Sequence, residues 1–135
     1  MPAKKSNSRR KKKGRYHRGD YVSSKMGVSY RYRSGWEEKF MAYLDSNPEV
    51  KSWTYEATVI EYISNVRTKK VRRYYPDFYV KYQNDIEEII EIKPKRKIEQ
   101  SVVKKKIEAA KQWCSDHRMT YRIITEIELK DIGLL

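Results

Sequence analysis

The fold is decided by one stretch of the sequence, residues 71–93, which reads VRRYYPDFYVKYQNDIEEIIEIK. Two runs in it, residues 71–82 and 86–93, are rich in Val, Ile, Tyr and Phe, which favour extended structure. They flank the polar triplet Gln83-Asn84-Asp85. Extended runs joined by three turn-forming residues are typical of a β-hairpin. The stretch therefore predicts two antiparallel strands, and Pro94 ends the second one.

This loop length sets which residues face each other. If Tyr82 pairs with Ile86, the numbers of opposed residues add to 168, and Asp77 lies opposite Glu91. Side chains alternate between the two faces of a strand, so Asp77, Glu91 and Lys93 are predicted to share one face. The same register would place Tyr75 opposite Lys93.

Two opposed acids call for compensation. Their Cβ atoms would lie about 5 Å apart, where like charges destabilise a sheet. Protonation, splaying into solvent or a divalent cation would relieve the repulsion, and carboxylates are ligands that Mg²⁺ uses. Lys93 would then lie beside the ion, where it could orient water and stabilise charge on a phosphate. The alternative is that Asp77, Glu91 and Lys93 only lie on a solvent-exposed face of the sheet without a catalytic role, as we expect of Glu87 and Glu88.

Outward from the hairpin, the sequence predicts further helices and strands. Apolar residues recur at helical spacing after a Ser34 cap and stop before Asn47-Pro48. The predicted order is α, three β, α, β, α, which favours an α/β (α+β) fold with a mixed sheet flanked by helices. The other expected elements are a strand over residues 53–63, a helix around residues 102–114, a strand over residues 121–124 and a helix opened by the capping box of residues 125–128.

Positive charge is concentrated at the amino terminus. The 135 residues carry a net charge of +13, and residues 1–20 hold nine bases against one acid. Such a segment contains too few apolar side chains to fold, so we expect a disordered arm over residues 1–20 and one domain over residues 21–135. Polycations bind polyanions by displacing counterions, so DNA is the expected partner. The basic cluster of the arm comprises Arg9, Arg10, Lys11, Lys12 and Lys13.

Composition excludes several classes of protein. The apolar stretches are too short to span a bilayer, and we expect a soluble protein without a secretion signal. Cys114 is the only cysteine, which excludes an internal disulfide and a zinc site built from cysteines. His17 and His117 are isolated, and each is expected to be a surface residue rather than a ligand.

Several motifs together resemble a known family. Residues 75–78, YPDF, and residues 90–93, IEIK, are similar to the core motif of the PD-(D/E)xK nucleases. With RSGWE at residues 33–37, NP at residues 47–48 and YE at residues 55–56, they resemble the TnsA-like endonuclease branch and, within it, the small head-completion nucleases of tailed phages. The resemblance implies a restriction-endonuclease-like αβββαβ core.

It also implies roles for individual residues. Asp77 and Glu91 would be metal ligands, the backbone carbonyl of Ile92 would add a contact, and Lys93 would be the catalytic lysine. Glu37 would complete the site. Two alternatives stay open: Ser34 and Glu37 also have the spacing of a capping box, and helical phase does not separate Glu37 from its neighbour Glu38. Glu56 departs from the family pattern, which tends to have glutamine there.

The resulting expectation is a Mg²⁺-dependent DNA endonuclease, with Mn²⁺ as substitute, that acts on packaged DNA ends during phage head completion. Its partners would be DNA and phage capsid, portal or neck proteins, without a membrane. A homodimer is compatible with the sequence, and the host cytoplasm or the virion is the expected location. The alternatives are a TnsA-like transposase subunit, a junction-resolving nuclease and a nonenzymatic DNA-binding virion or packaging protein. Expected DNA contacts beyond the arm are Arg31, Arg33, Lys95, Arg96 and Lys97.

Overall fold

The computed structural model describes residues 18–135. The predicted DNA-binding cluster at residues 9–13 lies outside these residues and stays a prediction. The described chain forms two compact units, which divide between Asn47 and Pro48. The single domain predicted over residues 21–135 stays a prediction.

The first unit contains an antiparallel pair, β1 (Gly19–Val22) and β2 (Ser29–Tyr32), and helix α2 (Gly35–Ser46). Strand β1 begins at Gly19, one residue before the predicted end of the arm at residue 20. The predicted helix is confirmed: the Ser34 hydroxyl accepts a hydrogen bond from the backbone N–H of Glu37, and the helix stops at Asn47. A serine cap satisfies a donor that has no partner within the helix, which explains why the helix begins there.

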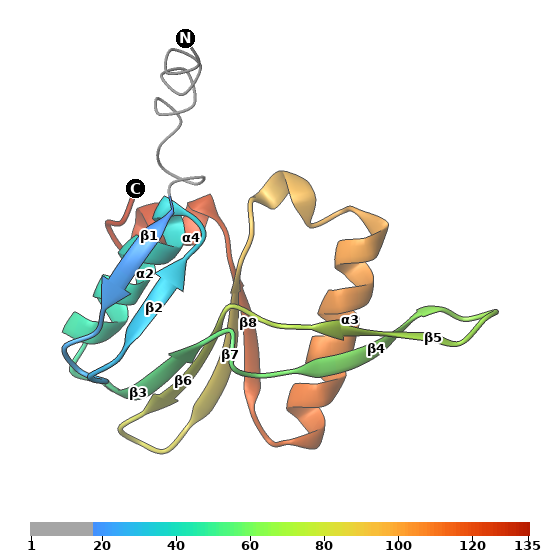
Figure 1. Cartoon of the computed structure of the whole chain (residues 1–135), viewed down its shortest axis with the longest axis horizontal. Coiled ribbons are helices and arrows are strands. Elements are labelled where there is room, and N and C mark those ends of the chain that lie inside the picture. The colour runs from blue at the N-terminus through green and yellow to red at the C-terminus, as the bar shows by residue number, and fades with distance from the viewer. Residues whose placement is uncertain (1–17) are drawn as a thin grey trace, which may run out of the picture. The chain divides into compact units, whose positions relative to one another are not determined.

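The second unit is built on a mixed four-stranded sheet in the order β3-β6-β7-β8 (Figure 1). Its strands are β3 (Val50–Tyr55), β6 (Phe78–Tyr82), β7 (Glu87–Ile92) and β8 (Thr120–Ile124). The first three run antiparallel to their neighbours, and β8 runs parallel to β7. Helix α3 (Ser101–Asp116) makes the crossover that a parallel connection requires. The α+β class and the mixed sheet are therefore as predicted.

The predicted register of the central hairpin is confirmed. Phe78 pairs with Ile90 and Tyr79 with Ile89, and the numbers in each pair add to 168. The backbone N–H of Tyr82 donates to the carbonyl of Ile86 at 2.9 Å. The three-residue loop is thus sufficient to set the pairing of β6 with β7.

The expected long strands over residues 53–63 and 71–82 are wrong, because each is broken in the middle. Their outer parts form a separate hairpin, β4 (Ile60–Asn65) with β5 (Lys70–Tyr74). The breaks have local causes: Glu56 has a left-handed φ of 52°, and Pro76 has no N–H to donate to a ladder. Figure 1 shows this hairpin leaving the sheet and running past α3.

Helices complete the second unit. Helix α3 packs on β4 and β8 with an apolar face that includes the buried residues Val103, Ala110 and Cys114. A short 3₁₀ turn, η2 (Lys95–Lys97), precedes it, and α4 (Glu126–Asp131) follows β8 and packs on it. The predicted capping box at Thr125 is present. No helix within residues 18–135 is long and apolar enough to cross a membrane.

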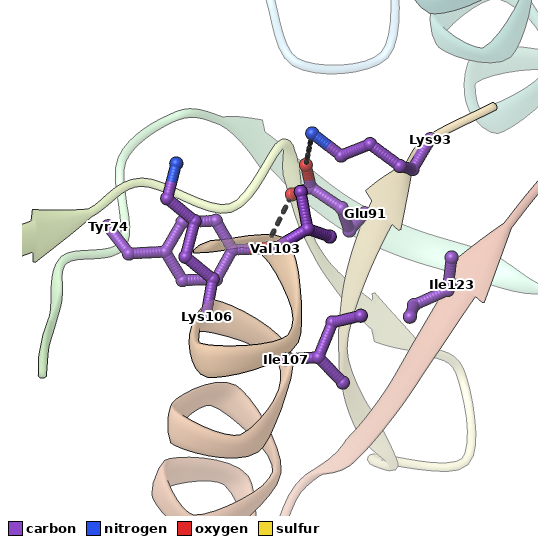
Figure 2. A pocket seen from close by; sticks show the side chains of 7 residues that line it. All are labelled: Tyr74, Glu91, Lys93, Val103, Lys106, Ile107 and Ile123. Atoms are coloured by element: carbon purple, nitrogen blue, oxygen red, sulfur yellow. Dashed lines mark hydrogen bonds and ion pairs between the residues drawn. The ribbon is translucent and has the colours of Figure 1, made fainter. Parts of the chain in front are cut away.

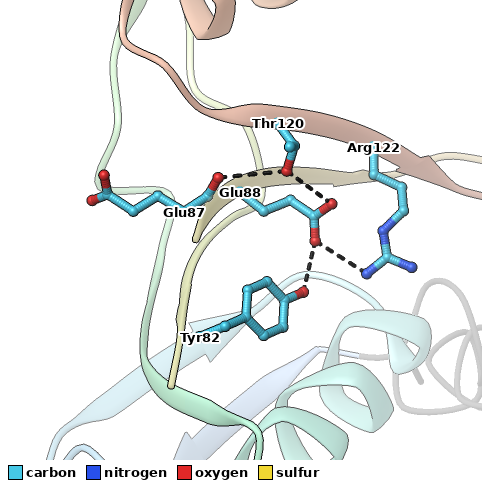
Figure 3. A network of polar contacts seen from close by, with 5 residues as sticks. All are labelled: Tyr82, Glu87, Glu88, Thr120 and Arg122. Atoms are coloured by element: carbon cyan, nitrogen blue, oxygen red, sulfur yellow. Dashed lines mark hydrogen bonds and ion pairs between the residues drawn. The ribbon is translucent and has the colours of Figure 1, made fainter. Parts of the chain in front are cut away.

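Glu87 and Glu88 were expected to decorate a wet sheet face, and the structure corrects this. Glu88 accepts hydrogen bonds from Tyr82 Oη at 2.6 Å, Thr120 Oγ1 at 3.2 Å and Arg122 Nη2 at 3.2 Å (Figure 3). Glu87 accepts one from Tyr79 Oη. Glu88 therefore joins three strands of the sheet, and it lies on the face opposite to Glu91, three residues further along β7.

Candidate active site

The predicted acids, Asp77 and Glu91, lie close together at the end of the sheet where the pairing of β3 with β6 stops. Asp77 directly precedes β6, and Glu91 lies near the end of the neighbouring strand β7. The backbone N–H of Glu56 donates to the carbonyl of Asp77 at 2.8 Å, so the left-handed turn at Glu56 holds the backbone of Asp77 in place. The break in the two strands thus leaves Asp77 at the start of β6, next to the end of β7 that carries Glu91.

The hydrogen bonds of the two acids join their strands directly. Asp77 Oδ2 accepts the backbone N–H of Ile92 at 2.8 Å, and Glu91 Oε1 accepts the N–H of Asp77 at 3.3 Å. Both residues are only 7% exposed. Lys93 Nζ lies 3.5 Å from Glu91 Oε2, and the Lys93 backbone donates to the carbonyl of Ile124. The structure therefore brings together three of the predicted site residues: Asp77, Glu91 and Lys93.

A tyrosine that the sequence did not single out completes this group. Tyr74 Oη donates to Glu91 Oε1 at 2.7 Å, from the last position of β5. Figure 2 shows Tyr74, Glu91 and Lys93 around a pocket that α3 closes with Val103, Lys106 and Ile107. The Lys106 ammonium lies 5.7 Å from the centre of the Tyr74 ring, a cation–π arrangement.

The predicted position of Tyr75 opposite Lys93 is wrong. Tyr75 is 46% exposed, and the pairing of β6 with β7 ends at Phe78 and Ile90, so Tyr75 has no ladder partner. Tyr74 takes the place beside Glu91 instead, because the chain turns at Pro76 and leaves the plane of the sheet. The alternating side-chain pattern could not reveal this, since it assumes a continuous strand.

Burial shapes the electrostatics of the pocket. It raises the pKa of Glu91, and the hydrogen bond from Tyr74 and the charge of Lys93 lower this pKa only in part. Burial and the nearby Glu91 charge also raise the pKa of Tyr74, so its hydroxyl keeps its proton and acts as a donor. Two buried carboxylates thus face one lysine, and their site favours a further positive charge.

The donor set fits a hard divalent cation. Asp77 and Glu91 offer carboxylate oxygens, and Mg²⁺ is commonly held by one or two carboxylates together with water and substrate phosphates. No group of three or more His, Cys, Asp and Glu side chains able to hold a metal occurs in residues 18–135. The contribution of the Ile92 carbonyl stays a prediction.

The fourth predicted site residue, Glu37, lies in the first unit. It is buried, and its Oε1 accepts the backbone N–H of Arg33 at 2.8 Å. The serine half of the capping box is formed, whereas the glutamate reaches the residue before the cap. Glu38 lies near Tyr32 and contributes to the raised pKa of that tyrosine, after burial. The role of Glu37 in the site stays a prediction, as does its alternative Glu38.

The expected DNA-contacting residues are exposed for the most part. Arg31 pairs with Asp20 at 3.3 Å, so part of its charge is already matched. Lys95, Arg96 and Lys97 form the 3₁₀ turn that begins two residues after Lys93, and the Lys95 N–H donates to Glu126 Oε1. The turn therefore places a basic segment next to the site along the chain. Its binding to DNA stays a prediction, as does that of Arg33.

Comparison with known proteins identifies the family of the chain. The family model for the N-terminal part of TnsA-like endonucleases matches residues 47–126, the segment that contains Asp77, Glu91 and Lys93. The "Head completion nuclease" of Enterobacteria phage T4 is 34% identical to the chain, over 76% of this chain and 82% of the T4 protein. The resemblance seen in the sequence motifs is therefore confirmed, and the chain belongs to the TnsA-like endonuclease family, as a nuclease related to the phage head-completion nucleases.

Proposed function

We propose that this protein is a Mg²⁺-dependent DNA endonuclease that hydrolyses phosphodiester bonds, with Mn²⁺ able to replace Mg²⁺. The observation that carries the proposal is the buried pair Asp77 and Glu91. Glu91 accepts a hydrogen bond from the backbone of Asp77, and Asp77 accepts one from the backbone of Ile92. Burying two adjacent acids costs free energy, and a bound divalent cation compensates for that cost. A purely structural role does not require the acids to be adjacent.

Each residue of the site has a defined task in this proposal. Asp77 and Glu91, with the backbone carbonyl of Ile92, would hold the ion. A bound Mg²⁺ would act as a Lewis acid toward the phosphate. The Lys93 ammonium is 3.5 Å from Glu91 Oε2, where it orients the attacking water and stabilises the charge that develops on the phosphate. The role of Glu37 remains the one that the sequence predicts.

The biological setting is the finer part of the proposal. The T4 relative is named a head completion nuclease, which supports action on packaged DNA ends during head completion. Capsid, portal or neck proteins would then be partners, in the host cytoplasm or the virion. A homodimer would suit a small nuclease that cuts both strands. The basic residues at positions 9–13, 31, 33 and 95–97 would hold the phosphate backbone.

Plasmid nicking tests the reaction. Full-length Asp77→Ala should lose at least about a hundredfold of the Mg²⁺-dependent nicking rate, because a metal ligand is removed. Its DNA binding should stay salt-sensitive and close to that of the unmodified protein. Glu88→Gln is the matched control: it changes a half-buried acid of the same strand on the other face, and it should keep its activity. Nicking by Asp77→Ala at the original rate would refute the site assignment and favour a nonenzymatic DNA-binding protein.

A further inference from the structure

The β4–β5 hairpin carries positive charge that the proposed catalytic site does not use. Residues 63–75 contain five arginines and lysines and no acid. Arg73 is matched by Glu61 at 3.9 Å, near the base of the hairpin. The other four are exposed and form no ion pair in the described part of the chain: Arg67, Lys69, Lys70 and Arg72.

The base of the hairpin is anchored to the second unit. Ile60, Tyr62 and Tyr74 form a buried cluster with Ala110 of α3, and Trp113 packs against it. Lys105 of α3 adds a hydrogen bond to the carbonyl of Ser64 at 2.7 Å. The hairpin is thus a structured projection, because one face of its base is part of the core.

The tip is also ordered by its own hydrogen bonds. Asn65 Oδ1 accepts the backbone N–H groups of Arg67 at 3.0 Å and Thr68 at 3.2 Å, and the Asn65 carbonyl accepts that of Lys69 at 2.7 Å. Lys69 adopts the left-handed conformation that such a turn requires, with a φ of 60°. A preordered turn presents its basic side chains with little further loss of backbone entropy on binding.

One strand of the hairpin connects its tip to the proposed catalytic site. Strand β5 runs from Lys70 near the tip to Tyr74, whose hydroxyl is 2.7 Å from Glu91. Four strand residues span about 13 Å. A DNA duplex rises about 3.4 Å per base pair, so this span corresponds to about four base pairs. The tip therefore lies close enough to the site for one bound duplex to contact both.

We propose that the tip of the β4–β5 hairpin binds the phosphate backbone of the DNA that the site cleaves. The identity of the ligand as DNA rests on the proposed nuclease function, and the charge of the tip complements that of a duplex. Arg67, Lys69, Lys70 and Arg72 each contact phosphate and release condensed counterions. The contacts add affinity without sequence preference, because phosphates carry no sequence information.

Salt-dependent binding tests the proposal. The affinity of full-length protein for a 30-base-pair duplex is measured by fluorescence anisotropy in EDTA, across a series of NaCl concentrations. Arg67→Gln/Lys70→Gln should reduce the slope of log K against log salt by about 1.8, which is up to about 60-fold in affinity at 0.1 M salt. The matched control is Lys51→Gln/Arg118→Gln. Both control residues are exposed, and they adjoin the opposite end of the sheet, where Val50 pairs with Tyr82 and Thr120 with Glu88.

The control should leave the slope within about half a unit of the unmodified value. Equal slopes for the hairpin and control variants would overturn the proposal. Because EDTA removes metal, this readout is independent of cleavage. If the unmodified protein failed to nick DNA but the hairpin variant still showed the reduced slope, only the proposed catalytic function would be refuted.

Photo-cross-linking provides a second, local readout. Val66 lies at the tip and is 79% exposed, whereas the native Cys114 is buried. A benzophenone attached to Val66→Cys should cross-link to the duplex, and one attached to the exposed helix position Ile127→Cys should not. Cross-links from position 66 to a second copy of the chain, without cross-links to DNA, would refute the proposal and favour a protein contact.

Discussion

Replacing Glu91 by glutamine should make the metal-free protein more stable. The substitution keeps an oxygen that can accept the hydrogen bonds from Tyr74 at 2.7 Å and from the Asp77 N–H at 3.3 Å. It removes one of two adjacent buried charges, and it also removes the partner of Lys93 at 3.5 Å. Burial raises the pKa of Glu91 despite these favourable contacts, so a charged acid at this position costs the folded protein free energy. We therefore expect Glu91→Gln to raise the free energy of unfolding by about 1 to 2 kcal/mol in EDTA, because the neutral amide avoids the cost of burying a charge.

A bound cation should make the unmodified protein more stable than Glu91→Gln. At a Mg²⁺ concentration a hundredfold above its dissociation constant, binding to the folded state stabilises the unmodified protein by about 2.7 kcal/mol. A variant that binds a hundredfold more weakly gains less than about 0.5 kcal/mol under the same conditions. The unmodified protein should then be the more stable of the two, because the metal gain exceeds the burial cost.

Thermal unfolding with and without metal measures both effects. One kcal/mol corresponds to roughly 4 °C in Tm for a chain of this size. Glu91→Gln should therefore melt about 4 to 8 °C higher than the unmodified protein in EDTA, and lower when Mg²⁺ is saturating. Glu88→Gln is the control, since Glu88 accepts three hydrogen bonds on the opposite sheet face. Loss of the Glu88 charge should destabilise the protein both in EDTA and in Mg²⁺.

Two outcomes would refute this reasoning. A lower Tm for Glu91→Gln in EDTA would mean that the acid stabilises the fold, as in a purely structural pair. An equal Mg²⁺ response of the unmodified protein and Glu91→Gln would place the cation away from this pair.

Two further predictions concern single side chains. Tyr74→Phe should lower the free energy of unfolding by about 1.5 to 3 kcal/mol, because a buried hydrogen bond to a charged acceptor is lost, and should slow nicking about tenfold with DNA binding unchanged. Urea unfolding and plasmid nicking measure the two effects, and unaltered nicking would show that Tyr74 does not position Glu91. Cys114 is 2% exposed, and burial raises its pKa to about 11, so alkylation should be slow at pH 8 and rise about tenfold per pH unit up to pH 10. Mass spectrometry follows the labelling, and prompt reaction of the native protein at pH 7 would contradict the buried placement.

Local patterns in the sequence were sufficient for much of the second unit. The three-residue loop at Gln83-Asn84-Asp85 sets the register of β6 and β7, because side chains alternate strictly and one slip would bury the wrong face. The cap at Ser34 and the stop before Pro48 delimit α2 for similarly local reasons. The proximity of Asp77 and Glu91 follows when this register is extended by one residue beyond the ladder.

The interruption of the long strands was beyond these patterns. Residues 53–63 and 71–82 each have continuous extended propensity, and only the contact between the Glu56 N–H and the Asp77 carbonyl shows that both break at the same level. This break shapes the proposed site, because it separates the β4–β5 hairpin from the sheet and turns Tyr74 toward Glu91.

The sequence by itself determined the residues of the proposed site, two acids and a lysine on one sheet face, and the excess of positive charge. Only the tertiary structure decided their surroundings, which are the Tyr74 hydroxyl, the Lys106 ammonium above its ring and the projecting basic hairpin. The physical reason is the range of the interactions involved. Register and caps depend on residues a few positions apart, whereas the burial that raises the pKa of Glu91 depends on β5 and α3, which fold back onto β7 from distant parts of the chain.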